Sequence, residues 1–230
     1  MSDTRLRYSG FPQAGEISSG APIFNKRFSA KFGTAGCILK HDASRKKYLL
    51  TCNHVLNNER FENNFNRFDS VLIKKPGEDI VVGTWSFGIM DDIIDLALVE
   101  IQGAALAGLR KQDFQFDEDF DVHKLLMKHV QLTGLNYDDI DGYVVEINKS
   151  FDMEYKNGTR TLSNTIFLAE STNENNPISI TRGGDSGAIV IDSENKNVVG
   201  MVVGGNDFYT CVIPFSSFRQ ILLDRSLSIY

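Results

Sequence analysis

The chain has 230 residues, of which 42% are hydrophobic, and its formal net charge is −6 at pH 7. A chain of this length and composition can bury a sizeable core, as a folded enzyme requires. The negative charge offers no basic patch for nucleic acid, and no apolar stretch reaches the roughly 18 residues that span a membrane. We therefore expect a globular protein that binds neither nucleic acid nor membranes.

The first residues and the cysteines bear on the compartment. Residues 1–10 contain no apolar core of a signal peptide, which favours a cytoplasmic location. Cys37, Cys52 and Cys211 are odd in number and widely spaced, unlike a disulfide framework, so we expect reduced thiols in the core. A zinc site formed by Cys37, Cys52 and His54 is the alternative. The chain has no Cys-x-x-Cys pair, so we expect neither a metal nor another cofactor.

Along the chain, turn residues separate short apolar runs. Residues 1–31 are rich in Gly, Ser and Pro and predict an extended arm lying on the body. Two sets of strand-like runs follow, joined by a linker at 103–121. The first set is 36–39, 48–51, 70–74, 80–85 and 94–101, and the second is 130–133, 142–147, 165–169, 188–191, 198–203 and 209–214, before a short closing helix at 216–223. This pattern is typical of antiparallel barrels, so we predict an all-β protein with an N-terminal barrel over 32–118 and a C-terminal barrel over 119–230.

The segment Thr181-Arg-Gly-Gly-Asp-Ser-Gly-Ala-Ile-Val-Ile191 places a serine between glycines at the start of an apolar run. Glycines let the backbone turn tightly and bring bare N–H groups beside the hydroxyl, where an oxyanion would form during acyl transfer. Ser186 is therefore a candidate nucleophile. A simple tight turn between strands would also suit Gly-Asp-Ser-Gly.

Two further segments favour the catalytic interpretation. The run Tyr48-Leu-Leu-Thr-Cys-Asn-His-Val-Leu56 ends a predicted strand at His54. The run Asp92-Ile-Ile-Asp-Leu-Ala-Leu-Val-Glu-Ile101 embeds Asp95 among apolar residues, where a carboxylate needs a partner. An imidazole that donates to a buried carboxylate is held in one tautomer and can accept the proton of a serine. Asp91 and Asp92 are competing acids in a turn-like stretch, and we expect them to be solvated.

The order His54, Asp95, Ser186 differs from that of subtilisins and of α/β-hydrolases. The chain resembles the chymotrypsin-like (trypsin-like) serine peptidases in Thr51-Cys-Asn-His54, Asp95-Leu-Ala-Leu98, Gly184-Asp-Ser-Gly187 and Gly200-Met-Val-Val-Gly-Gly205. The resemblance covers roughly residues 32 to 222. It implies two six-stranded antiparallel β-barrels with the active site in the cleft between them.

The resemblance also implies roles for particular residues. His54, Asp95 and Ser186 would form the catalytic triad of a serine endopeptidase acting on protein or peptide substrates, with the N–H groups of Gly184 and Ser186 as the oxyanion hole. In the family, the base of the primary specificity pocket lies six residues before the nucleophile, which here is Ile180. The other expected substrate-binding residues are Thr181, Val203, Gly204, Gly205 and Asp207. Asp207 is a candidate for attracting Arg or Lys.

Two alternatives stay open at this point. The chain is also compatible with a catalytically inactive relative that binds peptides, and with an esterase that uses the same triad. Many family members mature by exposing an N-terminal Ile-Val-Gly-Gly that meets the aspartate before the nucleophile. No such peptide is present in this chain, so Asp185 requires another donor. We expect constitutive activity or a regulatory protein partner that binds the 1–31 arm or the cleft loops.

Overall fold

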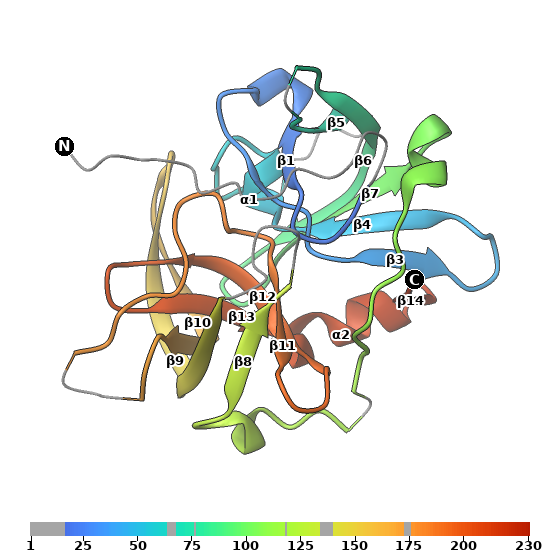
Figure 1. The fold of residues 1–230 in the computed structure, drawn as a ribbon. Helices are drawn as coiled ribbons and strands as arrows, with labels where there is room; N and C mark the ends of the chain where they lie inside the picture. Colours follow the sequence, from blue (N-terminus) through green and yellow to red (C-terminus); the bar gives the residue numbers. More distant parts are fainter. Residues whose placement is uncertain (1–16, 64–67, 76, 118, 134–139, 173–175) are drawn as a thin grey trace.

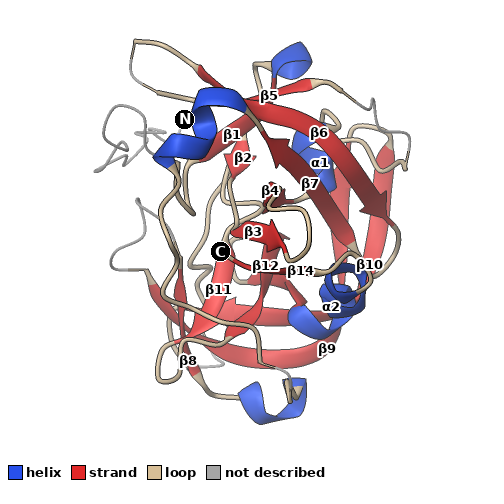
Figure 2. Ribbon diagram, turned by 90° about the vertical axis from the view of Figure 1, so that its right-hand side faces the viewer, coloured by secondary structure: helices blue, strands red, loops and turns tan. Residues whose placement is uncertain are grey.

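The computed structural model describes residues 17–63, 68–75, 77–117, 119–133, 140–172 and 176–230. These residues form two antiparallel sheets connected by a few short helices (Figures 1 and 2). No helix in this part of the chain is long and apolar enough to cross a membrane. The predicted all-β class is confirmed.

The first sheet has eight strands rather than the six expected. Their order across the sheet is β14-β3-β4-β7-β6-β5-β1-β2. The strands are β1 (Pro22–Asn25), β2 (Gly33–Thr34), β3 (Ile38–His41), β4 (Lys47–Thr51), β5 (Ser70–Ile73), β6 (Ile80–Met90), β7 (Asp95–Ile101) and β14 (Leu227–Ile229). The strands that the sequence did not predict are β1, which lies in the segment predicted as an arm, β2, which follows it directly, and β14, which comes after the second barrel.

The prediction of an arm over 1–31 is wrong for its described part, because residues 17–31 are built into the body. Ile17 is 1% exposed and forms a parallel bridge with Leu109. Strand β1 pairs with β5, with Ile23 opposite Ile73. A four-residue strand that begins with proline carries too little periodicity to be recognised from sequence. Residues 1–16 lie outside the described residues.

The second sheet is a closed six-stranded barrel, as predicted, in the order β10-β13-β12-β11-β8-β9. Its strands are β8 (His129–Leu132), β9 (Asp141–Tyr155), β10 (Gly158–Ala169), β11 (Ile189–Asp192), β12 (Val198–Gly205) and β13 (Thr210–Pro214). Strands β9 and β10 form a hairpin much longer than the predicted runs at 142–147 and 165–169. This hairpin extends beyond the barrel toward the first sheet (Figure 1).

The hairpin tip is bonded to the loop that follows the first helix. The N–H of Lys156 donates to the carbonyl of Glu59 at 2.8 Å. Asn157 pairs with Phe61 in both directions, since its Oδ1 accepts from the Phe61 N–H at 2.9 Å and its Nδ2 donates to the Phe61 carbonyl at 3.0 Å. The two sheets are therefore joined on one side of the cleft that lies between them.

Helices occupy the connections. They are α1 (Asn53–Leu56), α2 (Phe215–Leu223) and the 3-10 turns η1 (Lys26–Phe28), η2 (Gly103–Gly108) and η3 (Val122–Leu125). Helix α2 buries Phe215, Phe218 and Leu222, and the chain then returns to the first sheet, where Ile229 of β14 lies opposite Leu39 of β3. The predicted C-terminal unit of 119–230 therefore gives up its last strand to the other sheet.

Candidate active site

His54 and Asp95 come together where the first sheet ends. Strand β4 leads directly into α1, whose four residues are all buried, and His54 is 7% exposed. Asp95 is the first residue of β7, the strand paired with β4, and it is fully buried. The Nδ1 of His54 lies 2.5 Å from Oδ2 of Asp95, and the His54 N–H donates to Oδ1 at 3.0 Å. Because a carboxylate only accepts, Nδ1 carries the proton and Nε2 is left as an acceptor.

The competing acids do not take part in this pair. Asp91 and Asp92 are exposed. The Asp91 carboxylate accepts the N–H groups of Ile93 and Ile94, both at 2.8 Å, which is ordinary turn chemistry. Asp95 is therefore the acid that the fold brings to His54, as the apolar pattern around it predicts.

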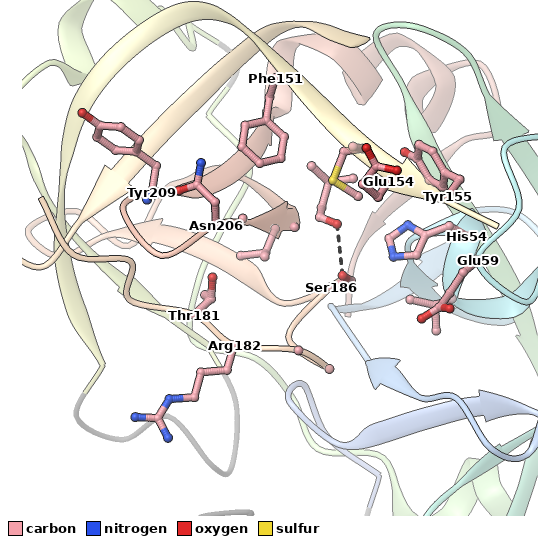
Figure 3. Close-up of a pocket in the computed structure, with 18 of the residues that line it drawn as sticks. His54, Glu59, Phe151, Glu154, Tyr155, Thr181, Arg182, Ser186, Asn206 and Tyr209 are labelled. Atoms are coloured by element: carbon pink, nitrogen blue, oxygen red, sulfur yellow. Dashed lines mark hydrogen bonds between the residues drawn. The ribbon is translucent and has the colours of Figure 1, made fainter. Parts of the chain in front are cut away.

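Ser186 comes from the other sheet and lies in the loop before β11. Two glycines with positive φ shape this loop, Gly184 at +102° and Gly187 at +101°. The Ser186 hydroxyl donates to the carbonyl of Val203 at 3.0 Å, and this bond, rather than one to His54, holds it in the structure. Ser186 and His54 nevertheless line the same cleft (Figure 3). Sequence reasoning found the residue but gave no signal for its bond to Val203.

Along residues 184–187, main-chain N–H groups that are hydrogen-bonded alternate with N–H groups that are not. The Asp185 N–H donates to the carbonyl of Arg182 at 3.1 Å, and that of Gly187 to Val202 at 2.8 Å. The N–H groups of Gly184 and Ser186 have no acceptor within the described parts of the chain. Unpaired main-chain donors next to a hydroxyl are what an oxyanion site requires. The carboxylate of Asp185 accepts the main-chain N–H of Arg182 at 2.7 Å.

The cleft has a volume of about 920 Å³ and takes its walls from both sheets. Five of the expected substrate-binding residues line the cleft. Val203, Gly204, Gly205 and Asp207 do so along β12 and the turn that follows it, and Thr181 does so beside the loop that carries Ser186. In Figure 3, Thr181, Asn206 and Tyr209 lie on the side of Ser186 away from His54. Asp207 is exposed, so it sits at the rim rather than at the bottom of the pocket.

Ile180, the residue expected at the pocket base, lies apart from the residues that line the cleft. Ile180 is not among the cleft residues, and its side chain packs on Gly142 and the barrel core. The neighbouring segment is instead fixed by Thr210, whose buried hydroxyl lies 2.7 Å from that of Thr181 and accepts the Ile180 N–H at 3.2 Å. The segment in which the pocket base was expected is therefore held by the hydroxyls of Thr181 and Thr210.

Aromatic and sulfur side chains complete the cleft and escaped the sequence analysis. Phe167 stacks on Tyr209 with ring centroids 5.1 Å apart, and Phe151 meets Phe167 edge-on at 5.8 Å. On the extended part of β9, every second residue is buried or partly buried, namely Phe151, Met153 and Tyr155, and all three line the cleft. This alternation was the available signal, and it was missed because the strand was predicted to end at 147.

Tyr155 lies against the His54–Asp95 pair. Its ring meets that of His54 edge-to-face at 6.0 Å, and its hydroxyl is buried without a hydrogen-bond partner within the described structure. Burial, assisted by the negative charge of Asp95, raises the pKa of the Tyr155 phenol. Tyr155 is therefore neutral and supplies an apolar wall beside the imidazole.

A group of potential metal ligands lies at the same place. Potential ligand atoms of Cys52, His54 and Asp95 lie within 4.8 Å of one another. Two of these residues already bond each other, and the Cys52 thiol donates to the Val202 carbonyl at 3.2 Å. Burial, with a smaller contribution from Asp95, raises the pKa of Cys52, so the thiol keeps its proton. These donors fit a hydrogen-bonded pair better than a metal centre.

Neither a protein-family model nor a curated protein matches the chain. Among solved structures it is similar to Thermobifida fusca Protease A, with 14% identity, 93% of this chain and 98% of that chain covered, and a TM-score of 0.59. It is similar to Nocardiopsis Protease, with 13% identity, 93% and 98% covered, and a TM-score of 0.61. It is similar to the alpha-lytic protease homolog N4, with 16% identity, 94% and 100% covered, and a TM-score of 0.62. At these identities the likeness concerns the fold, and the chain has the double β-barrel fold of the chymotrypsin-like serine proteases.

Proposed function

We propose that the protein is a serine endopeptidase in which Ser186 is the nucleophile, His54 the general base and acid, and Asp95 the group that orients His54. The observation that carries this proposal is the buried His54–Asp95 pair facing the same cleft as the Ser186 hydroxyl and two unpaired main-chain amides. No single member of this set is unusual in a protein core. Their convergence on one point of a cleft is what acyl transfer requires.

The first half of the reaction forms an acyl-enzyme. Rotation of the Ser186 side chain takes its hydroxyl from the Val203 carbonyl toward Nε2 of His54. Oγ then bonds to the substrate carbonyl carbon while its proton passes to Nε2, and the oxyanion is held by the N–H groups of Gly184 and Ser186. The C–N bond breaks as His54 returns that proton to the leaving amine.

The second half releases the acid. A water molecule attacks the ester carbon and gives its proton to Nε2, and Oγ leaves with the proton that His54 then returns. Throughout, Asp95 keeps Nδ1 protonated and stabilises the imidazolium without itself changing protonation state. The chain's own groups are sufficient for each of these transfers.

For the primary specificity pocket we propose a preference for uncharged side chains. This proposal is supported by the walls beside Ser186, which include Thr181, Phe167 and Tyr209, with Asp207 exposed at the rim. An exposed carboxylate attracts a guanidinium only weakly. Cleavage after Arg or Lys, the trypsin-like alternative, would depend on Asp207 alone.

One observation favours a second candidate, a catalytically inactive peptide-binding protein. It is the hydrogen bond that directs the Ser186 hydroxyl to Val203 instead of His54. A fluorophosphonate probe separates the two candidates, because it reacts only with a serine activated by a base. We expect labelling of the wild type and none of Ser186→Ala or His54→Ala.

The test of the function itself is cleavage of a peptide library by the purified protein. We expect hydrolysis by the wild type and its loss in Ser186→Ala at an unchanged melting temperature, since one hydroxyl in a loop adds little to packing. Ser150 is an exposed serine that lines the same cleft, so Ser150→Ala is the matched control. Hydrolysis of esters but of no peptide would identify an esterase. Near wild-type proteolysis by Ser186→Ala would refute the assignment.

A further inference from the structure

Thr34, in the two-residue strand β2, is hydrogen-bonded at two points to residues 183–187, the loop that carries the proposed nucleophile Ser186 and is called the nucleophile loop below. Its hydroxyl donates to the carbonyl of Gly184 at 2.8 Å, and its N–H donates to the carbonyl of Ser186 at 2.8 Å. Thr34 is 3% exposed and lies in the first sheet, whereas the loop belongs to the second. Both residues that carry the unpaired amides are thus anchored from across the molecule.

The anchor continues to the segment that carries His54. The hydroxyl of Thr51, the last residue of β4, donates to the carbonyl of Thr34 at 2.8 Å, and α1 begins two residues later. The contact leaves no room for a side chain at Gly187, where a Cβ would lie 2.2 Å from the Thr34 carbonyl oxygen and 2.5 Å from the Thr51 hydroxyl. Thr34 therefore connects the nucleophile loop to the segment that leads into α1, the helix that carries His54.

Gly184 needs such an anchor because it has no side chain that restricts its backbone torsions. It has φ of +102°, and glycine has no Cβ to restrict rotation about its backbone bonds. The Gly184 carbonyl shares a peptide plane with the Asp185 N–H, and this plane lies between the planes that carry the N–H groups of Gly184 and Ser186. Fixing the carbonyl therefore limits the directions of both N–H groups through the torsions on either side. Donors help catalysis only if they are aimed at the position the oxyanion will occupy before the charge develops there.

Building on the proposed function, we propose that Thr34 is a positioning residue, whose hydroxyl fixes the peptide plane between the amides of Gly184 and Ser186 and so keeps both directed at the oxyanion. It touches no reacting atom. Its loss should weaken binding of the tetrahedral intermediate while leaving binding of the ground-state peptide unchanged. A purely structural hydroxyl would alter stability and would not discriminate between these two states.

The experiment compares three variants of the full chain. Thr34→Val removes the hydroxyl at nearly constant volume, Thr34→Ser retains it, and Thr34→Ala is a second deletion in case valine does not fold. The matched control is Thr165→Val, since Thr165 is fully buried in β10 and its hydroxyl donates to the Lys149 carbonyl at 3.0 Å, away from the cleft. The readouts are kcat and KM on a peptide substrate, the inhibition constant of a peptide boronate, and the dissociation constant of a non-cleavable peptide.

We expect Thr34→Val and Thr34→Ala to lower kcat by about 10- to 100-fold and to weaken the boronate in parallel, with KM and peptide binding nearly unchanged. We expect Thr34→Ser and Thr165→Val to stay within about threefold of wild type. A folded Thr34→Val or Thr34→Ala with wild-type kcat and boronate affinity overturns the positioning role, as does failure of Thr34→Ser to restore kcat. If the wild type is inactive and is not labelled by the fluorophosphonate, both the proposed function and the positioning role are overturned. If the wild type is active and the Thr34 variants keep its kcat and boronate affinity, only the positioning role is overturned.

Discussion

The carboxylate of Asp95 holds His54 twice, with one oxygen on the imidazole and the other on the main-chain N–H of the same residue. The ring bond sets which nitrogen carries the proton, and the main-chain bond sets where the residue sits. Asp95 is fully buried at the start of β7, so solvent does not compete for either oxygen. A single side chain thus determines both the tautomer and the position of the proposed base.

Asp95→Asn should keep the fold and lose activity. An amide that still accepts from the His54 N–H turns its NH₂ toward Nδ1, so the ring proton moves to Nε2 and His54 can no longer accept from Ser186. We expect kcat to fall on the order of 10⁴-fold. Steady-state kinetics beside circular dichroism check this, with Asp91→Asn as the control from the adjacent exposed turn. Activity above a tenth of wild type would contradict the role.

Gly187→Ala should destabilise the fold strongly. The residue has φ of +101°, and its Cβ would lie 2.2 Å from the Thr34 carbonyl oxygen. Backbone strain and the clash together should lower the free energy of unfolding by on the order of 3 kcal/mol, measured by urea titration. Gly158→Ala is the matched control, with φ of +115° and no atom within 4 Å of its Cβ, and should lose about 1 kcal/mol. Equal losses in both variants would show that the clash is relieved at no cost.

Asp207→Asn should change cleavage specificity only slightly. The side chain is exposed at the rim of the pocket, and an exposed ion pair is worth about 0.2–1 kcal/mol, equivalent to about fivefold in kcat/KM at most. Competing Arg and Phe substrates measure the change, and Asp224→Asn, which alters an exposed acid on another face, controls for net charge. A loss of fiftyfold or more for the Arg substrate would mean that Asp207 reaches the bound side chain.

A blocked N-terminus should not prevent activity. The Asp185 carboxylate already accepts the main-chain N–H of Arg182 at 2.7 Å, so a newly exposed ammonium is not needed to satisfy it. We expect a fusion with an uncleavable N-terminal extension to hydrolyse peptides at the wild-type rate, with its length verified by intact mass. Activity that arises only after cleavage within residues 1–31 would instead identify a zymogen. Activity that requires an added protein would point to a regulatory partner.

The candidate catalytic residues were predictable because each lies in a local pattern with a chemical reason. Asp95 is a lone acid in an apolar run, Ser186 lies in a glycine-rich turn, and His54 follows closely after the end of a strand. Their order along the chain then selected the fold. The structure brings His54 and Asp95 into contact and turns Ser186 into the same cleft.

What sequence could not give was set by distant parts of the chain. Ile180 was assigned to the pocket base by position alone, but its direction depends on the packing space over Gly142. The bond from Ser186 to Val203 joins the loop before β11 to strand β12, and Thr34 reaches Gly184 across 150 positions of sequence. Strands β1 and β14 are short and acquire their identity from partners rather than from their own periodicity.

The pairing of β14 with β3 has a consequence for folding during synthesis. Strand β14, at residues 227–229, covers the edge of β3, so the sheet that carries Asp95 is completed by residues that follow the whole second barrel in the chain. During elongation that edge offers unpaired N–H and C=O groups to any neighbouring strand, including those of another nascent chain. The sheet that begins first in the chain is therefore completed only after the barrel that follows it, and deletion of residues 227–229 would expose the edge of β3.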